Sequence, residues 1–198
     1  FVIFTRGQGL AKKYNRYGDW VAYGIDDPRH YYYRGAYMDV VRAIDFIYQL
    51  PSTDRDNIFA EGGSQGGAFT LVSAALDDRI AAIAPYIPFL SDFPDYFRQV
   101  HWPAEPVIAA AKEAGVSEDA MYETLSYFDI KNLARWIKCP VLMGVGLQDP
   151  TCPPHTNFSG YNLINSPKEF VIYPALGHTV DYDDWNPRVH EFYRKHSR

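Results

Sequence analysis

The chain has 198 residues, which fits one domain with a substantial core, and 47% of them are hydrophobic, as in ordinary globular proteins. The formal net charge of −5 argues against a nucleic-acid partner, which would require a basic surface. No apolar run approaches membrane-spanning length, and two cysteines do not make a disulfide framework. No signal peptide is visible, so cytoplasmic, secreted and periplasmic locations in a bacterium all stay open.

The first part of the chain predicts one strand, one long loop and one helix. Residues 1–4 are apolar and read as a strand that ends at Thr5. Residues 14–30 are aromatic and rich in Gly, Asp and Pro without periodicity, which predicts a loop. Residues 37–50 carry Val40, Val41, Ile44 and Ile47 at helical spacing and precede Pro51, which predicts a helix. The aromatic run at 31–33 is interpreted as packing under that helix.

The next segment contains the most informative motif. Residues 58–60 read as the end of a strand and residues 68–76 as the start of a helix, with Gly-Gly-Ser-Gln-Gly at 62–66 between them. Strand, G-x-S-x-G and helix together are the nucleophile elbow of an α/β-hydrolase, in which Gly62 and Gly66 allow a sharp turn and Ser64 is exposed at its tip. The backbone N–H of Gln65 is then aimed at a developing oxyanion. The alternative is a plain glycine-rich turn.

After the elbow, residues 80–87 predict a second strand. Residues 92–115 interrupt the alternation with three prolines and are interpreted as a helical cap inserted over the active-site face of the domain. Ser117, followed by two acidic residues, predicts a helix start, and Asn186-Pro187 predicts another. Strands alternating with helices indicate a single α/β domain over residues 1–198, built on a mostly parallel sheet covered on both faces.

The other two members of a catalytic triad should follow the serine, the acid first and the histidine second. Residues 140–146 form a continuous apolar run typical of a strand buried on both faces, and Asp149 comes directly after it. The carboxyl end of such a strand is where α/β sheets place their chemistry. A turn aspartate before Pro150 is the competing interpretation.

Residues 168–174 predict the last strand, and Gly177-His178 follow it. In that position His178 is the candidate general base, oriented by Asp149. The remaining histidines fit less well, because they lie outside the required order or on predicted helices: His30, His101, His155, His190 and His196.

The sequence resembles the acetyl xylan esterases and cephalosporin C deacetylases of carbohydrate esterase family 7. The resemblance implies an esterase that removes acetyl groups from sugars and similar alcohols, assembled as a homo-oligomer, often a hexamer with active sites facing an inner cavity. It runs through nearly the whole chain and is carried by these blocks: Arg6-Gly7-Gln8, Asp27-Pro28 with Tyr31-Tyr32-Tyr33-Arg34, Gly62-Gly63-Ser64-Gln65-Gly66-Gly67, Thr124-Leu125-Ser126-Tyr127-Phe128-Asp129, Gly146-Leu147-Gln148-Asp149 with Cys152-Pro153-Pro154, and His178.

Two departures from the family pattern stand out. Thr179 follows the histidine where the family usually has a glutamate. The family's second oxyanion donor is a tyrosine backbone N–H from strands before Arg6-Gly7-Gln8, and nothing here matches it. We therefore expect a chain that lacks its N-terminal strands.

The substrate class expected is small acetylated carbohydrates, with xylo-oligosaccharides first, and no cofactor. No metal-binding spacing and no nucleotide-binding motif is present. Arg6 and Gln8 are interpreted as structural, tying loops beneath the elbow, with substrate contact as the alternative. The alternative functions are another hydrolase on the same fold, either dienelactone-hydrolase-like or a peptidase, and a non-catalytic module that kept the fold.

Overall fold

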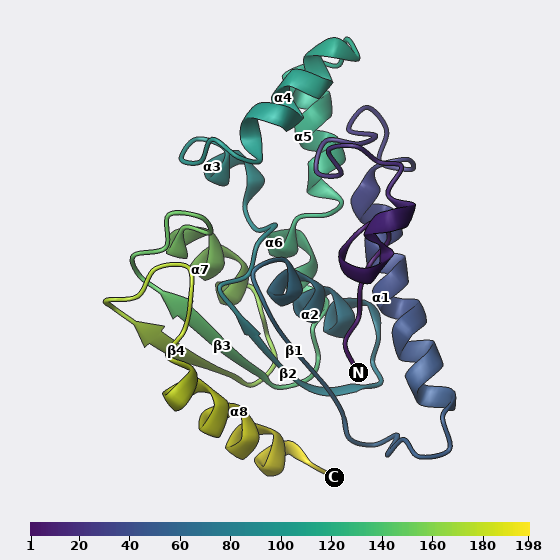
Figure 1. Cartoon of the computed structure of the whole chain (residues 1–198). Coiled ribbons are helices and arrows are strands. Elements are labelled where there is room, and N and C mark those ends of the chain that lie inside the picture. Colours follow the sequence, from purple (N-terminus) through teal and green to yellow (C-terminus); the bar gives the residue numbers. More distant parts are fainter.

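Four parallel strands form one sheet in the computed structural model, which describes residues 1–198 (Figure 1). Their order across the sheet follows the chain: β1 (Ile58–Gly63), β2 (Ile80–Tyr86), β3 (Val141–Gly146) and β4 (Lys168–Tyr173). The 3-10 helices are η1 (Gly9–Tyr14) and η2 (Ala134–Trp136); the α-helices are α1 (Tyr32–Gln49), α2 (Gln65–Leu76), α3 (Phe93–Tyr96), α4 (Ala104–Glu113), α5 (Glu118–Ser126), α6 (Ile130–Leu133), α7 (Pro154–Asn162) and α8 (Tyr182–His196).

Helices cover both faces of the sheet, which confirms the predicted fold class. On one face α2 packs directly on β1 and β2, and α1 packs on α2, around the larger hydrophobic core. On the other face α8 places Trp185, Val189 and Phe192 against β2 and β3 in a smaller core (Figure 1). Every residue of β3 is buried, because this central strand is covered from both sides.

Three sequence expectations are corrected by the structure. Residues 1–4 are not a strand, because they pair with none, and strand geometry persists only with a hydrogen-bonded neighbour. Helix α1 begins at Tyr32 rather than at 37, so Tyr32 and Tyr33 lie within the helix and extend its buried face. Helix α8 begins at Tyr182 and contains Pro187, because the Asp181 carboxylate accepts a bond from the Asp183 N–H and caps the helix earlier.

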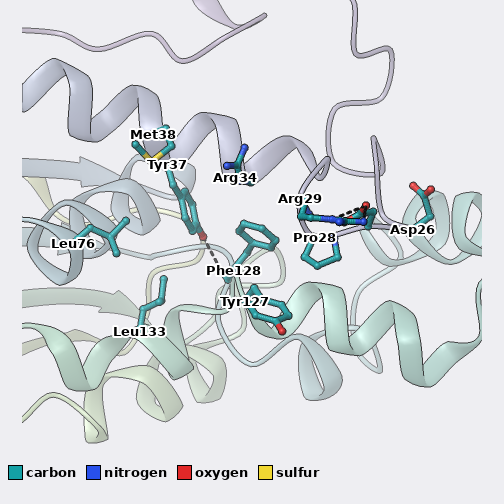
Figure 2. A pocket seen from close by; sticks show the side chains of 11 residues that line it. Asp26, Pro28, Arg29, Arg34, Tyr37, Met38, Leu76, Tyr127, Phe128 and Leu133 are labelled. Carbon is teal, nitrogen blue, oxygen red and sulfur yellow. Dashed lines mark hydrogen bonds and ion pairs between the residues drawn. The ribbon is translucent and has the colours of Figure 1, made fainter.

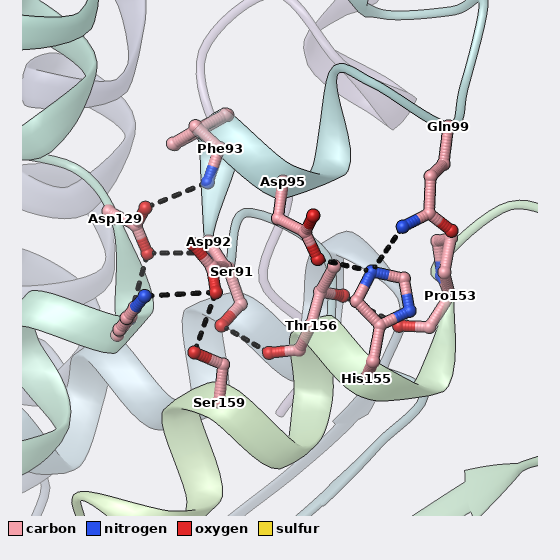
Figure 3. Close-up of polar contacts among 11 residues, drawn as sticks. Ser91, Asp92, Phe93, Asp95, Gln99, Asp129, Pro153, His155, Thr156 and Ser159 are labelled. Carbon is pink, nitrogen blue, oxygen red and sulfur yellow. Dashed lines mark hydrogen bonds and ion pairs between the residues drawn. The ribbon is translucent and has the colours of Figure 1, made fainter.

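A buried carboxylate ties the segment between β2 and α6 to the body of the domain (Figure 3). Asp129 accepts backbone N–H bonds from Asp92, Phe93 and Lys131 at 2.8, 2.9 and 2.9 Å. The Asp92 carboxylate in turn binds Lys131 Nζ at 2.9 Å and Ser159 Oγ of α7 at 2.7 Å. Burial raises the pKa of the Asp129 carboxyl, although the three N–H groups favour its ionised form.

The hydrogen bonds of Asp129 and Asp92, called the anchor below, flank the segment that contains helices α3, α4 and α5. This segment lies beyond the end of the sheet at which β3 leads into α7 (Figure 1). The segment expected to form a cap at 92–115 contains α3 and α4, and α5 packs against both. Ser117 accepts a bond from the Ala120 N–H at the start of α5, as its sequence position predicts. A role of the segment as a cap over the site stays a prediction. No helix is both long and apolar enough to span a membrane.

Candidate active site

Ser64 is the single residue between the end of β1 and the start of α2. Its backbone has φ 54° and ψ −119°, a sparsely populated conformation for a residue with a side chain. Hydrogen bonds on both sides hold it there: Ser64 N–H donates to Tyr86 O at 3.1 Å, and Ser64 O accepts from Ala68 and Phe89 N–H at 3.0 Å each. The strain is therefore sustained by the surrounding turn, as expected at a nucleophile elbow.

Close backbone approach explains two of the glycines around the serine. A Cβ on Gly62 would lie 2.6 Å from the Gly66 carbonyl, and one on Gly67 would lie 2.8 Å from Tyr86 O. By contrast, a Cβ on Gly66 would meet nothing within 4 Å, so the predicted steric need for glycine at that position is absent. Gly7, in the upstream motif, has φ +72° and lies in the left-handed region that favours glycine.

Three side chains from three strand ends meet in a line at this turn. His178 Nε2 lies 3.0 Å from Ser64 Oγ, and His178 Nδ1 lies 2.8 Å from Asp149 Oδ2. Asp149 follows β3 and His178 follows β4, so the parallel sheet delivers all three residues to its carboxyl edge. The structure thus brings together the three residues that the sequence singled out.

The acid of this group is fixed more firmly than the base. The side chain of Asp149 is 0% exposed, and its Oδ1 accepts the N–H groups of Thr151 and Cys152 at 2.8 and 2.9 Å. The side chain of His178 is 30% exposed, so the imidazole is partly accessible from outside the chain. This arrangement allows a hydroxyl to be activated by a base whose orientation is set by a buried carboxylate.

The helix start beside the serine provides a hydrogen-bond donor. Gln65 is the first residue of α2, where a backbone N–H has no acceptor within the helix and the helix dipole favours negative charge. Its side-chain Nε2 donates to Tyr33 Oη at 3.0 Å, which holds the amide against α1. The Gln65 N–H, at the start of α2 and next to Ser64, is the candidate donor to an oxyanion on a group attacked by Ser64.

A buried cysteine next to the acid was not singled out for the site by its sequence position. Cys152, Asp149 and His178 offer Sγ, carboxylate O and imidazole N atoms within 4.8 Å of one another, a spacing that a metal ion requires. Burial, with the neighbouring Asp149 charge, raises the pKa of the Cys152 thiol to about 12. Both Asp149 carboxylate oxygens and both His178 ring nitrogens already have hydrogen-bond partners, so this donor set does not fit a resident zinc ion.

The upstream Arg-Gly-Gln motif contacts α1 rather than the triad. Arg6 forms a two-point ion pair with Asp39, with Nη2 to Oδ1 at 2.6 Å and Nε to Oδ2 at 2.8 Å. Gln8 Nε2 donates to Tyr32 Oη at 2.8 Å. These contacts favour the structural interpretation of both residues over contact with a substrate.

A well-defined cavity lies away from the triad. It has a volume of about 900 Å³ and lies between the loop before α1, α1 itself, the end of α2 and the segment after α5 (Figure 2). Tyr37, one of its lining residues, donates its hydroxyl to the Phe128 carbonyl at 2.6 Å (Figure 2). Its lining residues are Asp26, Asp27, Pro28, Arg29, Arg34, Tyr37, Met38, Leu76, Tyr127, Phe128 and Leu133.

Comparison with known proteins shows the family to which the chain belongs. The acetyl xylan esterase family (AXE1) matches residues 1–196. An acetyl esterase of Xylanibacter ruminicola is 41% identical over 155 residues, which are 78% of this chain and 35% of that protein. This chain thus spans about a third of that curated relative.

Two solved structures are similar in both sequence and fold. The acetyl xylan esterase from Paenibacillus sp. R4 is 36% identical with a TM-score of 0.84, over 89% of this chain and 57% of that chain. Acetyl xylan esterase 1 from Thermoanaerobacterium sp. JW/SL YS485 is 29% identical with a TM-score of 0.82, over 92% and 60%. Acylaminoacyl peptidase from Pyrococcus horikoshii, at 17% identity and a TM-score of 0.64, is similar in fold alone.

Proposed function

This chain belongs to the acetyl xylan esterase family, and on that premise we propose that it is a serine esterase that removes O-acetyl groups from acetylated xylo-oligosaccharides and related small acetyl esters. The observation that carries the proposal is the continuous contact from Asp149 through His178 to Ser64, at 2.8 and 3.0 Å. A family resemblance without this contact would fit a binding module equally well.

The reaction proceeds in two half-reactions of the same form. Ser64 Oγ attacks the acetyl carbonyl carbon while His178 Nε2 takes the hydroxyl proton, and the Gln65 N–H donates to the oxyanion that forms. The tetrahedral intermediate collapses, the bond to the sugar oxygen breaks, and His178 returns its proton to that oxygen. Water then attacks the acetyl-serine with His178 again as base, which releases acetate and restores Ser64.

The decisive substrate test compares acyl chain lengths and alcohols. We expect p-nitrophenyl acetate to be turned over with a higher kcat/KM than the butyrate and octanoate esters, and acetate to be released from acetylated xylo-oligosaccharides. A clear preference for long acyl chains would contradict the deacetylase proposal. A peptidase would instead cleave acyl-peptide anilides. Esterases and peptidases share the fold and the triad, so neither feature gives specific support to that reaction.

The non-catalytic alternative has its own test. A fluorophosphonate probe should label the folded full-length protein at Ser64, because the probe needs a serine activated by a base. Labelling of wild type but not of Ser64→Ala supports an enzyme. Absence of labelling in a folded wild-type protein would favour a binding module instead.

Self-association is a separate part of the proposal. The family resemblance is the reason to expect a homo-oligomer, with a hexamer as the expected form. Light scattering coupled to size-exclusion chromatography measures the mass directly, and a monomeric mass would contradict this part without affecting the esterase proposal.

A further inference from the structure

Trp102 is a large apolar side chain that the triad and the acetyl chemistry leave unexplained. It lies in the loop between α3 and α4 and is 48% exposed, although an indole ring buries a large area when it serves as core. Its ring is stacked on Phe89, with centroids 6.0 Å apart and planes 25° apart. Trp20, from the loop before α1, packs edge-on against it at 5.9 Å.

Phe89 connects this indole to the residue expected to be the nucleophile. The Phe89 N–H donates to Ser64 O at 3.0 Å, so the residue on which Trp102 rests is bonded directly to the elbow. On its other side Phe89 packs against Tyr96, whose hydroxyl donates to Thr151 O at 2.7 Å, next to the loop that holds Asp149. Trp102 is therefore linked through Phe89 to the elbow and through Tyr96 to the loop that follows Asp149.

The exposed part of the indole has unused binding capacity. The Trp185 indole N–H donates to Glu61 at 3.1 Å, whereas the indole N–H of Trp102 has no acceptor within the chain. Two aromatic contacts hold the ring, so little conformational freedom remains to be lost when a ligand stacks on it. A half-exposed indole whose N–H has no partner in the chain suits a ligand that is apolar on one face and hydroxylated at its rim.

We propose that Trp102, supported by Phe89 and Trp20, is the platform on which a sugar ring of the substrate stacks while its acetyl group reaches Ser64. A pyranose matches this surface, because its axial C–H bonds form an apolar face and its hydroxyls form a polar edge that accepts the indole N–H. This inference rests on the proposed esterase function and deepens it: the platform selects a carbohydrate alcohol, whereas the triad acts on any acetyl ester.

The test separates sugar recognition from chemistry in the full-length protein. Trp102→Ala and Trp102→Phe are compared with wild type on mono-acetylated xylobiose and on ethyl acetate, an ester without a ring. We expect Trp102→Ala to lower kcat/KM on acetylated xylobiose about tenfold, mostly through KM, the scale of one lost stacking contact. On ethyl acetate it should stay within about twofold, and Trp102→Phe should retain most of the activity on the sugar ester.

The matched control is Trp136→Ala, because Trp136 is 61% exposed in η2 and contacts no other aromatic ring. It should leave both substrates unaffected. Equal losses on both esters in Trp102→Ala, or no loss on acetylated xylobiose, would overturn the platform while leaving the esterase proposal intact. A wild-type protein that hydrolyses ethyl acetate but not acetylated xylobiose would overturn the proposed substrate class, and the platform with it.

Discussion

Asp149 meets His178 through one carboxylate oxygen only, because the other is already occupied. Oδ2 lies 2.8 Å from His178 Nδ1, while Oδ1 accepts two backbone N–H groups from the loop that follows. The carboxylate cannot rotate to offer a different oxygen without breaking those bonds. The imidazole is thus held with its Nε2 directed at Ser64 Oγ.

The first prediction concerns the amide replacement Asp149→Asn. The two backbone donors will keep the amide oxygen in the Oδ1 position, so the NH₂ group faces His178 Nδ1 and forces the proton onto Nε2. An imidazole protonated at Nε2 cannot accept the Ser64 proton, and kcat should fall by a factor of the order of 10⁴. Steady-state kinetics with p-nitrophenyl acetate measure the loss, and unchanged thermal unfolding serves as the control for folding. A kcat within tenfold of wild type would mean that Asp149 does not orient the base.

The second prediction compares Ser64→Ala with His178→Ala and with their double mutant. Each single change should lower kcat by several orders of magnitude, on the order of 10⁴ or more, and the double mutant should lose little beyond that. Groups that act as one unit are not additive, because either loss stops the same proton transfer. Additive losses in the double mutant, or a single variant within tenfold of wild type, would place the nucleophile elsewhere.

The third prediction is the reactivity of the two cysteines towards thiol reagents. Burial raises the pKa of Cys139 to about 11 and that of Cys152 to about 12. At pH 8 both cysteines are then almost entirely protonated thiols, whereas the thiolate is the reactive form. Ellman's reagent should find no rapidly reacting thiol in the native protein and two after unfolding in guanidinium chloride.

The raised pKa values of the two thiols also make the stability of the fold depend on pH. Because the folded-state pKa values exceed that of an unfolded thiol, about 8.5, the folded state holds its thiol protons longer. The contribution to stability is present below pH 8.5 and is lost as the pH rises towards 11 and 12. A rapidly reacting thiol at pH 8 in the folded protein would contradict both statements.

The fourth prediction addresses the metal-like spacing beside the triad. Since both Asp149 oxygens and both His178 nitrogens already have hydrogen-bond partners, exhaustive dialysis against EDTA should leave esterase activity unchanged, and zinc should not raise it. Activity before and after dialysis, with metal content measured by mass spectrometry, checks this. Activity abolished by EDTA and restored by zinc would replace the proposed mechanism with metal-assisted hydrolysis.

The fifth prediction concerns the anchor beneath α3–α5. Asp129→Ala removes the acceptor of three backbone N–H groups at a residue that is buried. Unfolding in urea should show a loss of about 2–4 kcal/mol, the scale expected when buried donors are left without partners. Asp56→Ala, an exposed loop position, is the matched control and should stay within about 0.5 kcal/mol. A loss as small as that of the control would mean that the anchor does not hold this segment.

Much of the fold and the triad could be predicted from the sequence because the relevant signals are local. Strands of a parallel sheet contain short apolar runs, continuous and fully buried in β3, and each of the three triad candidates follows a strand within a few residues. The parallel sheet then brings those strand ends to one edge without further information. Helix starts were predictable where a side chain caps its own helix, as Ser117 does, and were misplaced where a proline suggested a later start, as at Pro187.

Only the tertiary structure shows the contacts between residues that are far apart in the chain. Asp129 joins Asp92 across 37 positions, and Cys152 reaches the triad through a loop whose course the sequence does not show. Trp102 reads in sequence as one more aromatic residue before a proline; its stacking on Phe89, which is bonded to Ser64, appears only in the folded chain. The physical reason is that apolar periodicity reports which side of an element is buried, whereas the partner buried against it is chosen by packing of the whole domain.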